Sequence, residues 1–176
     1  ISKKHLPLFD INSRMKSRKE MLNHLNQNNE DESFPMKPQR ILSDVRKVMD
    51  KGDILLSDVG AHKMWVAREY NCFEPNTCLI SNGFCTMGFA LPGSVGAKMA
   101  FPEKKVLSIN GDAGFLMNVQ DLETAVRTKI NVVAIVWLDG EYGLIKWKQQ
   151  VNFKGEHSDL MFENPDFSSL AKSFGM

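Results

Sequence analysis

The sequence has few of the features that mark several protein classes. Its 176 residues include only three cysteines, an odd count without CxxC spacing, which argues against a disulfide framework and a zinc site. The 22 basic and 21 acidic residues nearly balance, and the basic ones are scattered, so no nucleic-acid-binding surface is indicated. No apolar run reaches membrane-spanning length, and the first residues do not resemble a signal peptide. We therefore expect a cytoplasmic globular protein, without nucleic-acid or membrane partners, whose Cys72, Cys78 and Cys85 are buried free thiols.

The beginning of the chain differs in composition from the rest. Residues 10–38 are polar, rich in Asn, Lys and Glu, and contain two prolines near their end, which is typical of a linker or a surface lead-in. The chain starts with Ile1 and stops soon after a helical pattern, so we expect a fragment of a longer protein. We predict a lead-in segment over residues 1–37 and one domain over 38–176, truncated at both ends.

From residue 38 onward, short apolar runs alternate with helical patterns. The last apolar run, 131–137, is β-branched and does not alternate, as expected for a strand covered on both faces. Asn118 and Asn164 each precede a helical pattern and are predicted N-caps. Gly93, Gly96 and Ala97 are expected on the packed side of their helix. The pattern predicts an α/β fold, three layers α/β/α around a mostly parallel sheet, with strands at 53–57, 77–81, 105–109 and 131–137 and helices at 38–50, 61–70, 89–101, 118–128 and 164–174.

Acidic residues with small neighbours follow two of the predicted strands. Ligands of parallel sheets gather at the carboxyl ends of strands, and there the sequence reads "GDAG" (111–114) and "LDGEYG" (138–143). A Mg²⁺-bound diphosphate needs close backbone approach, which small residues permit, and oxygen ligands. Asp112 and Asp139, 27 residues apart, would meet if their strands were adjacent, and the turn after Asp139 would present the carbonyl of Glu141. Taken alone, "GDAG" also fits an ordinary strand-to-helix turn.

Several stretches together resemble a known family. "GDAGFLMN" followed by "LDGEYG" resembles the thiamine-diphosphate signature, GDG followed after a spacer by NN. "SDVGAHKMWVARE", "LISNGFCTMGFALPGSVGAKMAFPEKKVLSINGD" and "MNVQDLETAVRT" are similar to the cofactor-binding C-terminal domain of acetolactate synthases, most closely the catabolic, FAD-independent kind. The resemblance runs from about residue 38 to the end. It implies the thiamine-diphosphate-binding fold, thiamine diphosphate and Mg²⁺ as cofactors, and condensation of two pyruvate molecules to 2-acetolactate with release of CO₂.

The resemblance also assigns roles to residues. The side chains of Asp112 and Asp139 and the carbonyl of Glu141 would bind Mg²⁺. Met87 would support the bent V conformation of thiamine, which brings the 4′-imine next to thiazolium C2. Gly83 would belong to a turn over the ring. Other residues would lie along the diphosphate or flank the thiazolium and substrate pocket, and the whole cofactor-binding set is Val59, Gly60, Ala61, His62, Gly83, Met87, Gly111, Asp112, Ala113, Gly114, Asp139, Glu141, Tyr142, Gly143, Leu144 and Ile145.

The sequence departs from the family pattern at three positions. Ala113 replaces the second Gly of GDG, which is tolerable if its φ is negative. Leu138 and Asp139 replace the NN pair, and Asp139 keeps an oxygen ligand. Trp147 receives no role, because the register there is uncertain by one residue. Trp65 is interpreted as a core or interface side chain.

One catalytic group of the family lies outside this chain. The glutamate that protonates the pyrimidine N1′ belongs to the N-terminal pyrimidine-binding domain, which meets this domain across a dimer interface. The resemblance therefore implies a homodimer or tetramer, with that domain contributed in trans, and an isolated chain that does not turn over pyruvate. Two alternatives remain open: another thiamine-dependent 2-oxoacid enzyme, such as a pyruvate oxidase or decarboxylase, and a non-catalytic domain of the same fold.

Overall fold

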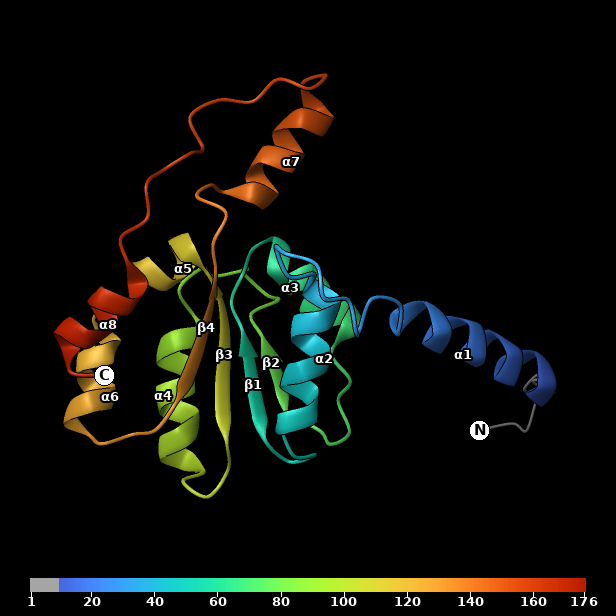
Figure 1. Ribbon diagram of the computed structural model, residues 1–176, viewed down its shortest axis with the longest axis horizontal. Helices are drawn as coiled ribbons and strands as arrows, with labels where there is room; N and C mark the ends of the chain where they lie inside the picture. The colour runs from blue at the N-terminus through green and yellow to red at the C-terminus, as the bar shows by residue number, and fades with distance from the viewer. Residues whose placement is uncertain (1–9) are drawn as a thin grey trace, which may run out of the picture.

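A computed structural model describes residues 10–176, and its centre is a four-stranded parallel sheet in the order β2-β1-β3-β4 (Figure 1). The strands are β1 (Ile54–Ser57), β2 (Cys78–Ile80), β3 (Val106–Gly111) and β4 (Val133–Trp137). Each pairing is parallel, as the alternation of strands and helices predicts. The helices are α1 (Ile11–Leu25), α2 (Pro38–Val48), α3 (Ala61–Glu69), α4 (Ala90–Ala100), α5 (Asp112–Met117), α6 (Asp121–Arg127), α7 (Gly143–Asn152) and α8 (Phe167–Phe174).

Helices cover both faces of the sheet, which confirms the three-layer α/β/α fold. Because successive strand residues point to opposite faces, Leu55 and Ile109 pack with residues of α2 and α3. Leu56 points the other way and packs against α4. On that same side Phe115 of α5 packs with Leu91 and Leu122, and α8 closes the layer. The central strands β1 and β3 are thus buried, whereas the edge strands β2 and β4 are half-buried.

The strand order creates a crevice at one end of the sheet. The chain runs from β1 to the edge strand β2, and then crosses back to place β3 on the other side of β1. The connections that leave β1 and β3 therefore diverge to opposite faces, and a cleft opens between the carboxyl ends of these two strands. The segments at this switch point begin at Asp58 and at Gly111, which are strand ends that the sequence singles out.

Both predicted asparagine caps are wrong. The segment after β3 forms the separate short helix α5, Asn118 lies at its C-terminal end, and α6 begins only at Asp121. The Asn118 side chain instead donates to the carbonyl of Gly88 at 2.8 Å. Helix α8 is capped by Asp166, whose carboxylate accepts from Ser169 N, and not by Asn164. An asparagine amide is a donor as well as an acceptor, and here tertiary partners take the donor.

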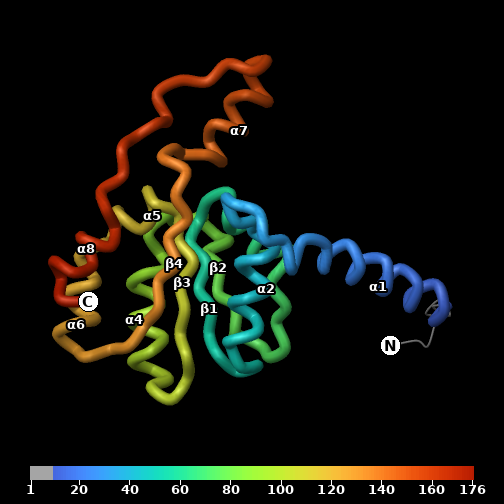
Figure 2. The backbone as a smooth tube through the Cα atoms, viewed as in Figure 1, coloured from blue at the N-terminus to red at the C-terminus, as the bar shows by residue number. Residues whose placement is uncertain are grey.

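Besides α5, two further helices were not anticipated by the sequence patterns. Helix α1 lies within the predicted lead-in, buries no residue, and projects away from the body of the molecule (Figure 1). Residues 1–9 of that lead-in lie outside the described residues, and the division of the chain at residue 37 stays a prediction. Helix α7 also buries no residue. It lies on the segment between β4 and α8, residues 138–166, which extends away from the sheet as an arm (Figure 2).

The cysteine prediction is half right. All three thiols are free, but Cys72 and Cys85 are exposed and Cys78 is half-buried. The exposed pair lies in the loops that flank α3 and β2 rather than within the layers. Among residues 10–176, no helix is long and apolar enough to cross a bilayer.

The two glycines of α4 are expected to respond oppositely to alanine. A Cβ on Gly93 would lie 2.7 Å from Cδ2 of the buried Leu56, whereas a Cβ on Gly96 meets nothing within 4 Å, so the prediction that Gly96 is packed is wrong. Gly93→Ala should lower the free energy of unfolding by about 1–3 kcal/mol through overpacking. Gly96→Ala should raise it by about 0.5–1 kcal/mol, because alanine restricts the unfolded chain and favours the helix. Urea unfolding of both variants measures these changes in the free energy of unfolding. Changes of the same sign and size would contradict the packing described for Gly93 and Gly96.

Candidate functional site

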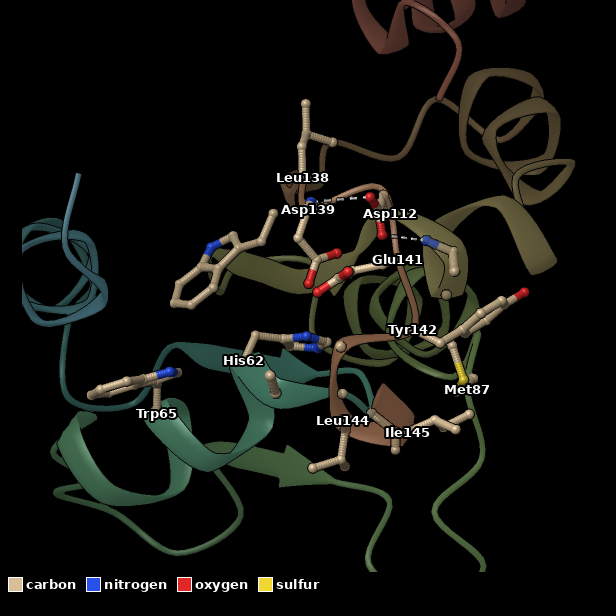
Figure 3. A pocket seen from close by; sticks show the side chains of 18 of the residues that line it. His62, Trp65, Met87, Asp112, Leu138, Asp139, Glu141, Tyr142, Leu144 and Ile145 are labelled. Carbon is tan, nitrogen blue, oxygen red and sulfur yellow. Dashed lines mark hydrogen bonds between the residues drawn. The ribbon is translucent and has the colours of Figure 1, made fainter. Parts of the chain in front are cut away.

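The crevice at the strand ends holds a cavity of about 390 Å³ (Figure 3), a size typical of small-molecule and cofactor sites. It lies where β1, β3 and β4 end and where the loop after β2 approaches them. The residues that line it are Pro38, Val59, Gly60, Ala61, His62, Trp65, Cys85, Met87, Gly111, Asp112, Ala113, Gly114, Trp137, Leu138, Asp139, Glu141, Tyr142, Gly143, Leu144 and Ile145.

Strand register brings the two aspartates together. Gly111 of β3 pairs with Trp137 of β4, so the residues that follow each strand leave the sheet side by side. Asp112, which is only 2% exposed, accepts hydrogen bonds at Oδ2 from the backbone N–H groups of Asp139 (3.2 Å) and Gly140 (2.8 Å). The prediction that adjacent strands bring these segments together is therefore confirmed. What they bind stays a prediction.

A second pair of carboxylates closes the same corner of the cavity. A Cβ on Gly143 would lie 2.8 Å from Asp139 Oδ2 and 4.0 Å from Glu141 Oε1, so both acids stand over this glycine. Burial raises the pKa of Asp139, and the neighbouring charge of Asp112 raises it further. The Glu141 carboxylate accepts from Lys146 Nζ at 2.6 Å, which offsets part of the negative charge. Among the described residues, no three His, Cys, Asp or Glu side chains are grouped to hold a metal ion; the predicted ligand set is two carboxylates and a carbonyl.

His62 forms the floor between the ends of β1 and β3, below the acids in Figure 3. It is 5% exposed, its Nε2 has no hydrogen-bond partner among the described residues, and burial lowers its pKa to about 4. The imidazole is therefore neutral at pH 7. A Cβ on Gly60 would lie 2.9 Å from this ring, and one on Gly111 would lie 3.2 Å from it. Glycine at these two positions therefore leaves room for the imidazole ring to pack against both strand ends.

A buried carboxylate that the sequence reading missed fixes the loop that carries Met87. Asp58, at the end of β1, is fully buried, and its carboxylate accepts from the backbone N–H groups of Gly88 (2.9 Å), Phe89 (3.2 Å) and Val59 (2.8 Å). Asn118 holds the carbonyl of the same glycine, whose φ is +81°. Burial raises the pKa of Asp58 against the effect of these hydrogen bonds. Both polar groups of one glycine are thus fixed, and Met87 next to it points into the cavity (Figure 3).

The predicted site residues converge almost completely. Every one of them lines the cavity except Gly83, which lies outside the lining, in the loop after the edge strand β2. Cys85 of this loop reaches the cavity instead. Ala113 lies in the first turn of α5 and is not among the residues with positive φ, so its methyl group is tolerated as expected.

The sequence reading missed five residues of the lining. Trp65 is not a core side chain: it is 36% exposed and follows Ala61 by one helical turn on the cavity side of α3. That i, i+4 spacing is a signal that could have found it. Trp137 is the last residue of β4, and Leu138 follows it. Pro38 reaches the cavity from the start of α2, and Cys85 reaches it from the loop that also holds the predicted residues Gly83 and Met87.

The fold and this site together define a class of protein. An open parallel sheet with a crevice at its switch point has its ligand site at the carboxyl ends of the strands, and here small residues, a buried histidine and paired carboxylates line that crevice. The chain belongs to the thiamine pyrophosphate enzymes: residues 58–176 match the C-terminal TPP binding domain of that family.

Curated relatives agree with this assignment. The chain is 40% identical over 138 residues to an acetolactate synthase of Bacillus subtilis (strain 168), covering 78% of this chain and 24% of the relative. It is 36% identical over 142 residues to a catabolic acetolactate synthase of Raoultella terrigena, covering 81% and 25%. It is 38% identical over 146 residues to the acetolactate synthase isozyme 3 large subunit of Escherichia coli (strain K12), covering 81% and 25%. The chain thus spans about a quarter of the length of these relatives.

A solved structure shares the fold. The thiamine diphosphate-dependent 4-hydroxybenzoylformate decarboxylase of Rhodococcus jostii RHA1 superposes with a TM-score of 0.73 at 24% sequence identity. The similarity covers 80% of this chain and 26% of that one. It supports the architecture of the sheet and its helical layers.

Proposed function

We propose that this chain is the cofactor-binding domain of a thiamine diphosphate- and Mg²⁺-dependent acetolactate synthase, which condenses two pyruvate molecules to 2-acetolactate and CO₂. The observation that carries the cofactor assignment is the register of β3 with β4, which sets Asp112 beside the Asp139 turn in a glycine-lined cavity. The names of the relatives, all acetolactate synthases, support the reaction. A cytoplasmic location is part of this proposal.

The residues present fit both cofactors. Oxygen donors are the ligands that Mg²⁺ prefers, and Asp112, Asp139 and the carbonyl of Glu141 would supply them. The diphosphate would lie along the backbone of Gly60 and Gly111, which line the cavity beside the His62 ring. The buried, unpartnered Nε2 of His62 is a polar atom for which a ligand oxygen would provide a partner.

The chain would position and desolvate the cofactor. Thiamine diphosphate, when bound, supplies the electron sink that decarboxylation of a 2-oxoacid requires. Met87 would press against it from the loop that Asp58 fixes, and so maintain its bent conformation. The apolar side chains of Trp65, Leu144 and Ile145 would exclude water from the reacting end.

The exposed arm is the proposed contact with the rest of the enzyme. On and next to α7, large apolar side chains are solvent-exposed, including Trp147 (61%) and Phe153 (63%). Exposed apolar patches mark interaction surfaces. We place here the pyrimidine-binding domain of a second subunit, which would also bring the N1′ glutamate, in a homodimer or tetramer.

Product analysis of the full-length protein tests the function. With pyruvate, thiamine diphosphate and Mg²⁺ we expect 2-acetolactate, and chelation of the metal with EDTA should stop its formation. Acetaldehyde or acetyl phosphate as the main product would replace the proposal by a decarboxylase or an oxidase. Absence of any turnover, together with no binding of thiamine diphosphate, would indicate a non-catalytic domain. Residues 1–176 alone should show no carboligation, because the glutamate is missing.

A further inference from the structure

The carboxylate of Asp112 is held by four N–H groups. Ala113 N donates to Oδ1 at 2.8 Å, and Asp139 N and Gly140 N donate to Oδ2. The fourth donor is a side chain: Nδ2 of Asn164 donates to Oδ2 at 2.6 Å, the shortest of the four distances. Backbone donors follow from the fold. The amide of Asn164 is the contact that depends on a single side chain.

Asn164 reaches Asp112 from a distant part of the chain. It follows Asp112 by 52 residues and stands where the α7 arm returns to the body, just before α8. The neck of that arm is closed by hydrogen bonds from Phe162 N to Gly140 O (2.9 Å) and from Tyr142 N to Leu160 O (3.0 Å). Asn164 is not part of the cavity lining, so it lies behind Asp112 as seen from the ligand side. It can therefore act on a ligand only through this aspartate.

The amide of Asn164 is arranged for its donor contact. Its Oδ1 is buried and has no hydrogen-bond partner within residues 10–176. A buried acceptor without a partner costs about 1–3 kcal/mol, so the position is not explained by stability alone. Asn164 is also not the N-cap of α8, because the side chain of Asp166 caps that helix. The contact that remains is the one with Asp112.

We infer that Asn164 is a positioning residue for the metal-binding carboxylate of Asp112. An ionised carboxylate offers about four lone-pair sites, two on each oxygen. Three donors converge on Oδ2, one more than its two lone-pair sites, whereas Oδ1 accepts one hydrogen bond and keeps a free site. Asn164 adds a side-chain donor to the two backbone donors at Oδ2, and so helps to hold the carboxylate in the rotation that leaves Oδ1 available to Mg²⁺. The inference rests on the proposed function, since the metal is part of that proposal.

The test is the apparent affinity for Mg²⁺, measured by calorimetric titration of Mg²⁺ into the full-length protein at one fixed concentration of thiamine diphosphate. Asn164→Ala and Asn164→Leu should both weaken Mg²⁺ binding by about 10–100-fold, the usual effect of losing a partner behind a metal ligand. Leucine fills the space of the amide without its donor, so it separates the hydrogen bond from packing and serves if the alanine variant does not fold. Asp166→Ala is the matched control, because it removes the cap of α8 two residues away without touching Asp112.

Each outcome decides the inference. Loss of Mg²⁺ affinity in both Asn164 variants, with parental affinity in Asp166→Ala, supports it. Parental affinity in the Asn164 variants, while Asp112→Ala loses the metal, overturns the positioning role and leaves the proposed function intact. An equal loss in Asp166→Ala also overturns it, because general loosening of the segment would then be the cause. A parent protein that binds thiamine diphosphate without any need for Mg²⁺ overturns the proposed metal site and the inference together.

Discussion

Asp112→Ala is expected to abolish Mg²⁺-dependent binding of thiamine diphosphate, with an apparent Kd raised on the order of 100-fold or more, because loss of an outer partner alone costs about 10–100-fold. The variant removes a proposed metal ligand from a site where it is 2% exposed. It also leaves the four N–H groups of Ala113, Asp139, Gly140 and Asn164 without their acceptor. Calorimetric titration of the full-length variant with thiamine diphosphate, with and without Mg²⁺, measures the effect.

Asp112→Asn is a milder substitution at the same position, because it keeps one of the two side-chain oxygens. Its single oxygen can still accept from donors that converge at Oδ2, but its amide then faces the N–H of Ala113 and presents no free oxygen to a metal. It should therefore fold better than Asp112→Ala and still lose Mg²⁺ dependence. If either variant binds Mg²⁺ and cofactor as the parent does, Asp112 is not the metal ligand.

Asp58→Ala is expected to lower both stability and cofactor affinity. The fully buried carboxylate accepts from three backbone N–H groups, of Val59, Gly88 and Phe89, and each would lose its partner. A buried donor left unpaired costs about 1–3 kcal/mol; relief of the buried charge, reflected in the raised pKa of Asp58, offsets part of this. We expect a loss of roughly 3 kcal/mol, a large share of the roughly 5–15 kcal/mol that stabilises a typical domain. Release of the Met87 loop should weaken thiamine diphosphate binding by about 10–100-fold.

Asp53→Ala separates these two effects. Asp53 precedes the same strand at its opposite end, is 6% exposed, and accepts from the backbone N–H groups of Asp50 (2.7 Å) and Lys105 (3.0 Å). It should lose comparable stability in urea unfolding and keep parental affinity for the cofactor. If the two variants lose cofactor affinity to the same extent at equal stability, Asp58 has no specific role in fixing the loop.

Much of the fold is predictable because its signals are local. The run of 131–137 is apolar and β-branched, and its residues Val133–Trp137 become β4; because β4 lies at the edge of the sheet, it is only half-buried, and the expectation that both its faces are covered is wrong. Short connections and alternating elements lead to a parallel sheet, and strand ends in a parallel sheet share one edge. The meeting of Asp112 with the Asp139 turn follows from that edge and from the adjacency of β3 and β4. The resemblance to a family supplied the identity of the ligand, which spacing alone left open.

What the sequence did not predict depends on contacts between distant segments. Asn118 and Asn164 both look like helix caps locally, because the side-chain oxygen of asparagine suits that position. Their amide donors are used elsewhere, at Gly88 and at Asp112, across 30 and 52 residues. Helix α7 has no buried face whose pattern could reveal it. Cys85 lines the cavity from a loop in which its own φ is +50°, a backbone conformation that is uncommon for residues other than glycine.

The closed neck of the α7 arm has a consequence for how such chains diversify. Two hydrogen bonds, from Phe162 N to Gly140 O and from Tyr142 N to Leu160 O, hold the two ends of the arm together. The residues between them therefore form a closed loop. Doubling the length of a closed loop costs only about 0.6 kcal/mol in closure entropy. Insertions, deletions or wholesale exchange of this loop can therefore reshape the wall contributed by Leu144 and Ile145 without resetting β4 or Asp112. The apolar end of the crevice can thus change in sequence while the end that holds Asp112 stays constant.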